Sequence, residues 1–294
     1  MRFMPSIKTL VIGGAAAAVL ALVSPAISTS PARAATTPMA DLVVRSDKLA
    51  EQWVVRDENL TAGLCSVEEG NITPGVRRLL RFTVMTPNVG DADINLGDPN
   101  EHVANNDGLY EFATCHQHYH FRHYALYQLI DPQTGHIWRA AKRGFCMLDT
   151  DPNPASFGPE PPKDPQFRSC GAVGVPGNQG ISHGWADTYR FFLGGQYFVL
   201  DGGDGQAPVP AGRYIVRITV NPPFVPEAGE PCRAADPLHP GVCHQLPESN
   251  YENNVGEVVL NIPDRPGRTG VGPGAGTAAA EDKDEHGESI KKIK

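Results

Sequence analysis

The sequence predicts a mainly β protein, built as an antiparallel β-sandwich-like domain with long loops held by disulfides. Three observations lead to this fold class. Short stretches of alternating or β-branched residues recur along the chain, 31 glycines and 27 prolines supply turns between them, and six cysteines are available for bridges. Many short strands joined by turns are typical of an antiparallel sandwich.

Four stretches carry the strand signal, because they combine β-branched, aromatic or alternating apolar residues and lead into turn residues. They are residues 76–84, 118–130, 212–220 and 255–262. Only residues 42–53 have a helical pattern. Two long loops rich in Pro and Gly, 149–180 and 224–249, interrupt the strands. Loops of this length inside a compact domain are usually functional or held by disulfides.

Residues 1–34 are typical of a secretory signal peptide. They open with Arg2 and Lys8, continue with an apolar run over 10–23 and end at the small-x-small motif 32–34. The apolar run is too short to span a bilayer, and no later segment is apolar for long enough. We therefore expect a secreted, extracellular protein with no membrane span.

Residues 264–294 carry Gly, Ala and mixed charge without apolar periodicity, which predicts a disordered tail. The remaining residues, 40–263, have a suitable length for one all-β domain. The signal peptide holds three basic residues and no acidic ones, so its removal changes the net charge from −8 to −11. Such an acidic exported protein is a poor partner for nucleic acid and favours cationic small molecules or basic proteins.

The six cysteines are an even number in an exported chain, which predicts disulfides. Six cysteines allow fifteen pairings. Their positions in the sequence favour one of these bonds, because Cys232 and Cys243 bracket the same loop.

The most informative stretch is CHQHYH at 115–120. In a strand, residues two apart point to the same face, so His116, His118 and His120 would project three imidazoles to one side. Their rings can meet at one ion, at about 2 Å from each nitrogen. Three imidazoles suit copper, zinc, nickel or iron. The alternative is a solvated histidine surface, which is disfavoured because the rings would repel each other when protonated.

Beyond the histidines, the chain resembles the catalytic domain of the lysyl oxidases. The motifs that carry this resemblance occur in the family's order and extend over roughly residues 40–262. They are CHQHYH at 115–120, HY at 123–124 before LID at 129–131, KRGFCMLDT at 142–150, DTY at 187–189, RYIVRITVNP at 213–222 and ESNYENN at 248–254.

The resemblance implies copper(II) bound by the three histidines. It also implies that Lys142 and Tyr189 become lysine tyrosylquinone, a cofactor formed when copper and oxygen oxidise the tyrosine ring and the lysine amine adds to it. A quinone carbonyl reacts with a primary amine, as no unmodified side chain does. We therefore expect a copper-dependent amine oxidase of the protein-lysine 6-oxidase type. It would oxidise peptidyl lysine or small primary amines to aldehydes with molecular oxygen, releasing hydrogen peroxide and ammonia.

Three residues are candidates for the general base of this reaction. Asp187 lies two residues before Tyr189, so on a strand the two side chains would share one face, and we favour it. His123 and His183 are the alternatives.

The turn at 248–254 indicates a second ion site. Its oxygen-bearing side chains are those of Glu248, Asn250, Asn253 and Asn254. Such a set suits a hard cation such as calcium. The resemblance adds Asp41 and the carbonyl of Leu42, which would clamp the N-terminal segment to the last strand. The alternative is an Asn-rich turn without an ion.

The chain also departs from the animal enzymes of this family. The segment between the third histidine and the His-Tyr pair is shorter, and one partner of each of two local cysteine pairs is missing. The resemblance implies a Cys115–Cys170 bridge, which leaves Cys65 to pair with Cys146. The loop with Cys232 and Cys243 is an addition. These departures leave the substrate preference open.

Two other functional classes compete with the amine oxidase. A zinc hydrolase would use the histidine triad, although the chain has no HExxH motif. A calcium-stabilised adhesion or binding module would explain the fold and the Asn-rich turn but not the three histidines. The bound metal would separate the three classes.

Overall fold

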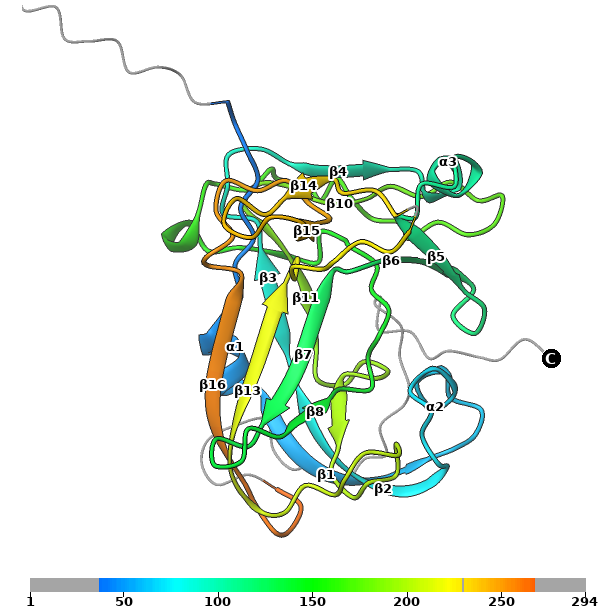
Figure 1. Cartoon of the computed structure of the whole chain (residues 1–294), viewed down its shortest axis with the longest axis vertical. Helices are drawn as coiled ribbons and strands as arrows, with labels where there is room; N and C mark the ends of the chain where they lie inside the picture. Colours follow the sequence, from blue (N-terminus) through cyan, green and yellow to red (C-terminus); the bar gives the residue numbers. More distant parts are fainter. Residues whose placement is uncertain (1–36, 229, 268–294) are drawn as a thin grey trace, which may run out of the picture. The chain divides into compact units, whose positions relative to one another are not determined.

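Antiparallel strands make up most of the described chain, as Figure 1 shows. The computed structural model describes residues 37–228 and 230–267 of the 294-residue chain. The predicted signal peptide and residues 268–294 of the predicted tail lie outside these ranges. Among the described residues, no helix is both long and apolar enough to cross a membrane.

Short helices and many strands alternate along the described part of the chain. The helices are α1 (Ser46–Glu51), α2 (Cys65–Glu69), α3 (Pro99–Ala104) and the 3-10 helix η1 (Ala155–Phe157). The strands are β1 (Trp53–Leu60), β2 (Gly75–Phe82), β3 (Val84–Pro87), β4 (Ile94–Gly97), β5 (Tyr110–Ala113), β6 (His118–Phe121), β7 (Ala125–Ile130), β8 (Ile137–Arg139), β9 (Asp151–Pro152), β10 (Gln179–Ile181), β11 (Trp185–Tyr189), β12 (Tyr197–Val199), β13 (Gly212–Val220), β14 (Ala234–Ala235), β15 (Cys243–His244) and β16 (Val255–Ile262).

The largest sheet has the order β16-β13-β7-β8, and all its pairs are antiparallel. On β13, Tyr214, Val216, Ile218 and Val220 are buried on one face. The intervening side chains are partly exposed. The predicted strands 212–220 and 255–262 are therefore confirmed as β13 and β16.

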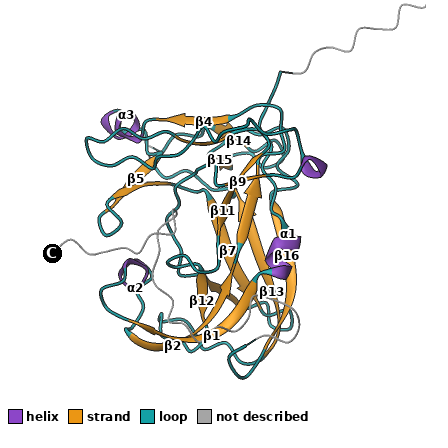
Figure 2. Ribbon diagram, turned by 180° about the vertical axis from the view of Figure 1, so that it is seen from behind, coloured by secondary structure: helices purple, strands orange, loops and turns teal. Residues whose placement is uncertain are grey.

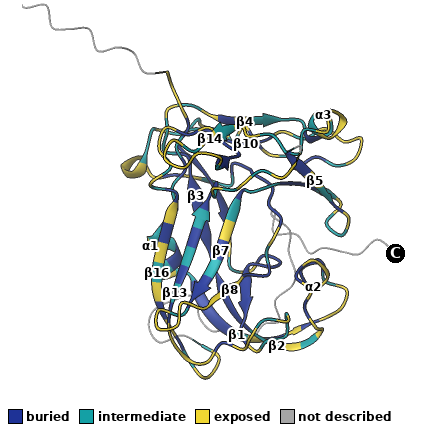
Figure 3. Ribbon diagram, in the orientation of Figure 1, coloured by how far each residue is buried: buried dark blue, intermediate teal, exposed yellow. Residues whose placement is uncertain are grey.

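Two further sheets, β1-β2-β12 and β3-β11-β9, are also antiparallel. Phe82 of β2 meets Tyr127 of β7 edge-on, with ring centres 5.5 Å apart, and stacks on Phe198 of β12 at 5.0 Å. The β1-β2-β12 sheet and the largest sheet thus share one aromatic core. Figure 2 shows their strands from behind, and Figure 3 shows the buried positions along them. The mainly β, antiparallel fold class is confirmed.

One predicted helix is shorter than the pattern indicated, and two predicted strands are each divided into two. The predicted helix 42–53 contains only α1, because Leu42 pairs with Asn88 in an isolated bridge and β1 begins at Trp53. The predicted strand 76–84 is interrupted at Thr83, whose N–H donates to the Gln52 carbonyl.

The predicted strand 118–130 divides into β6 and β7. His123 adopts a φ of +56°, and the Arg122 N–H donates to the Leu109 carbonyl, so the chain turns between the two strands. At the other end of the domain, Gly267 pairs with Val55 of β1. The first residues of the predicted tail therefore pack on the domain.

Three disulfides are present, and two of the expected pairings were wrong. The bonds are Cys65–Cys115, Cys146–Cys170 and Cys232–Cys243. The last pair agrees with the prediction. The expected pairs Cys115–Cys170 and Cys65–Cys146 do not form, because α2 lies against the turn between β5 and β6 and brings Cys65 within 5.5 Å (Cα to Cα) of Cys115. This separation suits a disulfide.

Candidate active site

His118 and His120 lie on β6, and His116 lies in the turn that joins β5 to β6. Their ring centres are 5.4 Å apart for His116 and His118, 5.4 Å for His116 and His120, and 5.0 Å for His118 and His120. The expectation that all three stand on one strand was wrong. His116 lies in the turn before β6, where Gln117 has a φ of +61°. The turn nevertheless brings the first ring to the other two.

The ring spacing suits a shared metal ion. With the ion about 2 Å from each nitrogen, each ring centre is roughly 3 Å from it, and tetrahedral angles then separate the centres by about 5 Å. Among the described residues, no group of three or more His, Cys, Asp or Glu side chains has an arrangement that could hold a metal ion. The three rings therefore have the spacing expected of metal ligands. They do not have the arrangement of a ligand set around one ion. Rotation of the imidazoles about their χ angles would be needed to direct three ring nitrogens at one ion.

Two residues outside the predicted set contact the histidines. Glu69, the last residue of α2, places Oε1 2.6 Å from His116 Nδ1. Gly144 packs directly on the His120 ring, and a Cβ at this position would overlap ring atoms. Neither contact has a local sequence signal, because both join segments that are distant along the chain.

Lys142 and Tyr189 come together beside the histidine strand. Lys142 Nζ lies 4.8 Å from the centre of the Tyr189 ring and 5.4 Å from that of Phe145. The Phe121 N–H donates to the Phe145 carbonyl over 2.7 Å, which joins the end of β6 to segment 142–146. This segment therefore runs between the histidines and Tyr189.

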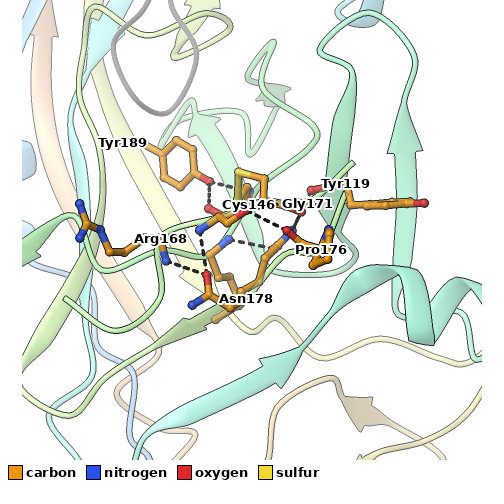
Figure 4. Close-up of a disulfide and its surroundings, with 11 residues drawn as sticks. Tyr119, Cys146, Arg168, Gly171, Pro176, Asn178 and Tyr189 are labelled. Carbon is orange, nitrogen blue, oxygen red and sulfur yellow. Dashed lines mark hydrogen bonds between the residues drawn. A yellow bond between two sulfur atoms is a disulfide. The ribbon is translucent and has the colours of Figure 1, made fainter. Parts of the chain in front are cut away.

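The Tyr189 ring is buried and its orientation is fixed. Its hydroxyl accepts from the Cys146 N–H and donates to the Cys146 carbonyl, both at 2.8 Å. Phe145 packs edge-on against it, with ring centres 5.3 Å apart. Figure 4 shows the hydroxyl pointing at Cys146, next to the Cys146–Cys170 disulfide.

Asp187 is buried on the same strand as Tyr189, two residues before it. Its surroundings include two buried tyrosines of the core. Burial raises the pKa of Tyr124 and Tyr127 well above the ordinary value, and the Asp187 carboxylate raises both further. The Tyr124 hydroxyl also lies 2.6 Å from Thr86 Oγ1. Asp187 thus belongs to a buried hydroxyl cluster.

The two alternative bases are engaged elsewhere. His123 stacks on Phe224, with ring centres 4.2 Å apart, and its Nε2 lies 3.0 Å from Glu230 Oε1. His183 Nδ1 lies 2.6 Å from Asp93 Oδ1 near the surface. Each of these rings is therefore paired with a carboxylate.

The second predicted ion site joins the two ends of the domain. Asn253 Nδ2 donates to Asp41 Oδ1 over 2.9 Å, and the Leu42 N–H donates to the Glu248 carboxylate. The side-chain oxygens of Asn253 and Asn254 are buried and accept no hydrogen bond from the described residues. Carboxylate and amide oxygens of this kind fit a hard cation.

Asn250 differs from the other residues of this set. It is exposed, and its Oδ1 accepts from the Glu252 N–H at 2.9 Å. Its side chain therefore closes its own turn.

Comparison with known proteins supports the resemblance seen in the motifs. The profile of the Lysyl oxidase family matches residues 40–229. Lysyl oxidase homolog 2 is 26% identical over 228 residues in both Homo sapiens and Pongo abelii, which covers 73% of this chain and 23% of each relative. Lysyl oxidase homolog 1 of Homo sapiens is 30% identical over 152 residues, 51% of this chain and 22% of the relative. The chain thus spans less than a quarter of the length of these relatives.

Proposed function

This chain belongs to the lysyl oxidase family, and from that membership we propose that it is a secreted copper-dependent amine oxidase. Its cofactor would be a lysine tyrosylquinone made from Lys142 and Tyr189. The observation that supports this most directly is the position of segment 142–146. One end carries Lys142 over the Tyr189 ring, and Gly144 touches the ring of His120.

His116, His118 and His120 would hold the copper ion, since their spacing fits three imidazoles around one centre. Copper with molecular oxygen supplies the oxidising chemistry that makes the quinone, and the quinone carbonyl supplies the electrophile for a primary amine. The protein's own part is to hold these groups close together and away from bulk water. The buried ring of Tyr189 meets the second condition.

Lys142 and Tyr189 are close enough to be joined by a small movement. A nitrogen bonded to the ring would stand roughly 3 Å from its centre. Lys142 Nζ stands over the ring at 4.8 Å from its centre, so the side chain has to move by at least about 2 Å, from the face of the ring to its edge. The two hydrogen bonds of Cys146 hold the ring while the lysine, which has rotatable χ angles, moves.

Asp187 remains our proposed general base. It lies on the same strand face as Tyr189, and its carboxylate is buried near the Tyr124 hydroxyl, where a proton can be shared. His123 and His183 are disfavoured by their stacking and surface contacts. The substrate would be a cationic primary amine, either peptidyl lysine or a small amine, in keeping with the acidic composition.

We also propose a structural calcium ion between Asp41, Glu248, Asn253 and Asn254. Two buried amide oxygens and two carboxylates support this, and the family resemblance adds the carbonyl of Leu42. The ion would fasten the N-terminal segment to the turn before β16.

The deciding experiment looks for the cofactor itself. Copper-loaded, aerated protein should yield one crosslinked tryptic species joining the Lys142 and Tyr189 peptides. It should also absorb visible light, and phenylhydrazine should shift that absorption. Lys142→Arg should bind copper but form no adduct, since a guanidinium stays protonated. Lys163→Arg, at an exposed loop position, is the matched control and should form the crosslink normally.

The alternative functions give different results. A zinc hydrolase or a calcium-stabilised binding module predicts separate, unmodified peptides containing Lys142 and Tyr189. Their recovery from copper-loaded protein that oxidises no amine would remove the proposed function. Their recovery from protein that does oxidise amines would remove only the quinone.

A further inference from the structure

One carboxylate outside the family motifs contacts the histidine cluster. Glu69 Oε1 lies 2.6 Å from His116 Nδ1, and the His116 side chain is only 6% exposed. A carboxylate can only accept a hydrogen bond, so the shared proton belongs to Nδ1. The lone pair of this imidazole is then on Nε2, the nitrogen away from Glu69.

The short helix α2 holds Glu69 in this position. Its first residue, Cys65, is bonded to Cys115, the residue directly before His116. Cys65 and Glu69 are four residues apart, about one helical turn, so both side chains leave α2 on the same face. Figure 1 shows α2 next to the tip of the β5–β6 hairpin. One helix face therefore supplies a covalent bond and a hydrogen bond to the same turn.

We propose that Glu69 is a positioning residue of the metal site, which keeps His116 in the Nδ1–H tautomer and directs Nε2 toward the ion. This inference rests on the metal role proposed for His116. Metal-binding histidines usually donate their second N–H to such an acceptor, which fixes the ring and raises its basicity. Loss of the acceptor typically lowers metal affinity roughly 10- to 100-fold.

The first test measures the copper(II) dissociation constant of the full-length protein and three variants. We expect Glu69→Ala to raise the constant roughly 10- to 100-fold. Glu69→Gln should have a smaller effect, because an amide oxygen still accepts from Nδ1–H. Glu68→Gln removes the same charge from an exposed neighbour in α2 and should leave the constant unchanged. Unchanged affinity in folded Glu69→Ala would overturn the positioning role.

The second test needs neither copper nor activity. Nitrogen-15 NMR of the metal-free protein reports the imidazole tautomer. His116 should be in the Nδ1–H form in the wild type and in Glu69→Gln, and in a mixture of forms in Glu69→Ala. An Nε2–H form in the wild type would overturn the inference. A Glu69-dependent tautomer in a protein that oxidises no amine would support the hydrogen-bonding role and count against the proposed function.

Discussion

Some residues that take no part in the proposed reaction still determine the geometry of the candidate active site. Gly144 is the main example, because its missing side chain leaves the space that the His120 ring occupies. Its φ lies outside the left-handed region, so the close contact and not the backbone conformation requires a glycine. In the sequence, Glu69 lies outside the family motifs, and Gly144 lies inside the motif at 142–150 without any signal of its contact with His120. The histidines, Lys142 and Tyr189 could be proposed from their motifs, whereas residues that support them from distant segments could not.

Gly144→Ala should therefore damage the proposed metal site. A methyl group at this position meets the buried His120 ring, and overpacking of this kind costs about 1–3 kcal/mol of stability. We expect lower copper affinity and less crosslinked cofactor, measured by copper titration and peptide mapping. Gly63→Ala is the control, because its nearest neighbour is 4.0 Å away. Equal copper affinity in the two variants would show that the His120 contact has no influence on the metal.

At the level of helices and strands, the alternation of apolar and polar residues predicted the strands that have one buried and one exposed face. β13 and β16 coincide with the predicted ranges 212–220 and 255–262 for this reason. The same pattern fails where the chain leaves a sheet, at Thr83 and His123, because a period of two reports the buried face and not the hydrogen-bonding partner. Disulfide pairing also cannot be predicted from a sequence pattern, since it depends on distances between cysteines in the folded chain.

The disulfides give a prediction at this scale. Non-reducing peptide mapping should recover Cys65–Cys115, Cys146–Cys170 and Cys232–Cys243. Removing Cys65–Cys115 should cost about 4 kcal/mol by loop entropy, and removing Cys232–Cys243 about 3 kcal/mol, since their sequence separations are 50 and 11 residues. Only the first double Cys→Ser variant should also lose copper affinity, because its bond adjoins His116. Loss of copper in both variants alike would contradict this difference.

For the whole domain, one long-range connection joins its first residues to the turn before β16. The Glu248 carboxylate accepts from the Leu42 N–H, from Asn221 Nδ2 at 2.6 Å and from Asn254 Nδ2 at 3.0 Å. The Ser249 N–H donates to the Ala40 carbonyl at 2.9 Å. One buried carboxylate therefore couples the N-terminal segment, the end of β13 and the start of β16.

The charge on Glu248 should make this connection depend on pH. Burial raises its pKa from the ordinary 4.5 to about 7, against the lowering effect of its hydrogen bonds. Between these two values the unfolded chain releases the proton and the folded chain keeps it, so stability is fully present below pH 4.5 and falls as pH rises to 7. The loss amounts to about 3 kcal/mol.

Glu248→Gln cannot titrate and isolates this effect. In a chelator, the unfolding free energy of the wild type minus that of Glu248→Gln should fall as pH rises from 4.5 to 7. Bound calcium stabilises the ionised carboxylate, so an excess of calcium should flatten or reverse the fall in the wild type. Parallel pH curves in the chelator would contradict the raised pKa. A fall that calcium leaves unchanged would remove the ion from this turn, and the hydrogen bonds of Glu248, Ser249 and Asn253 would then hold the two ends of the domain together.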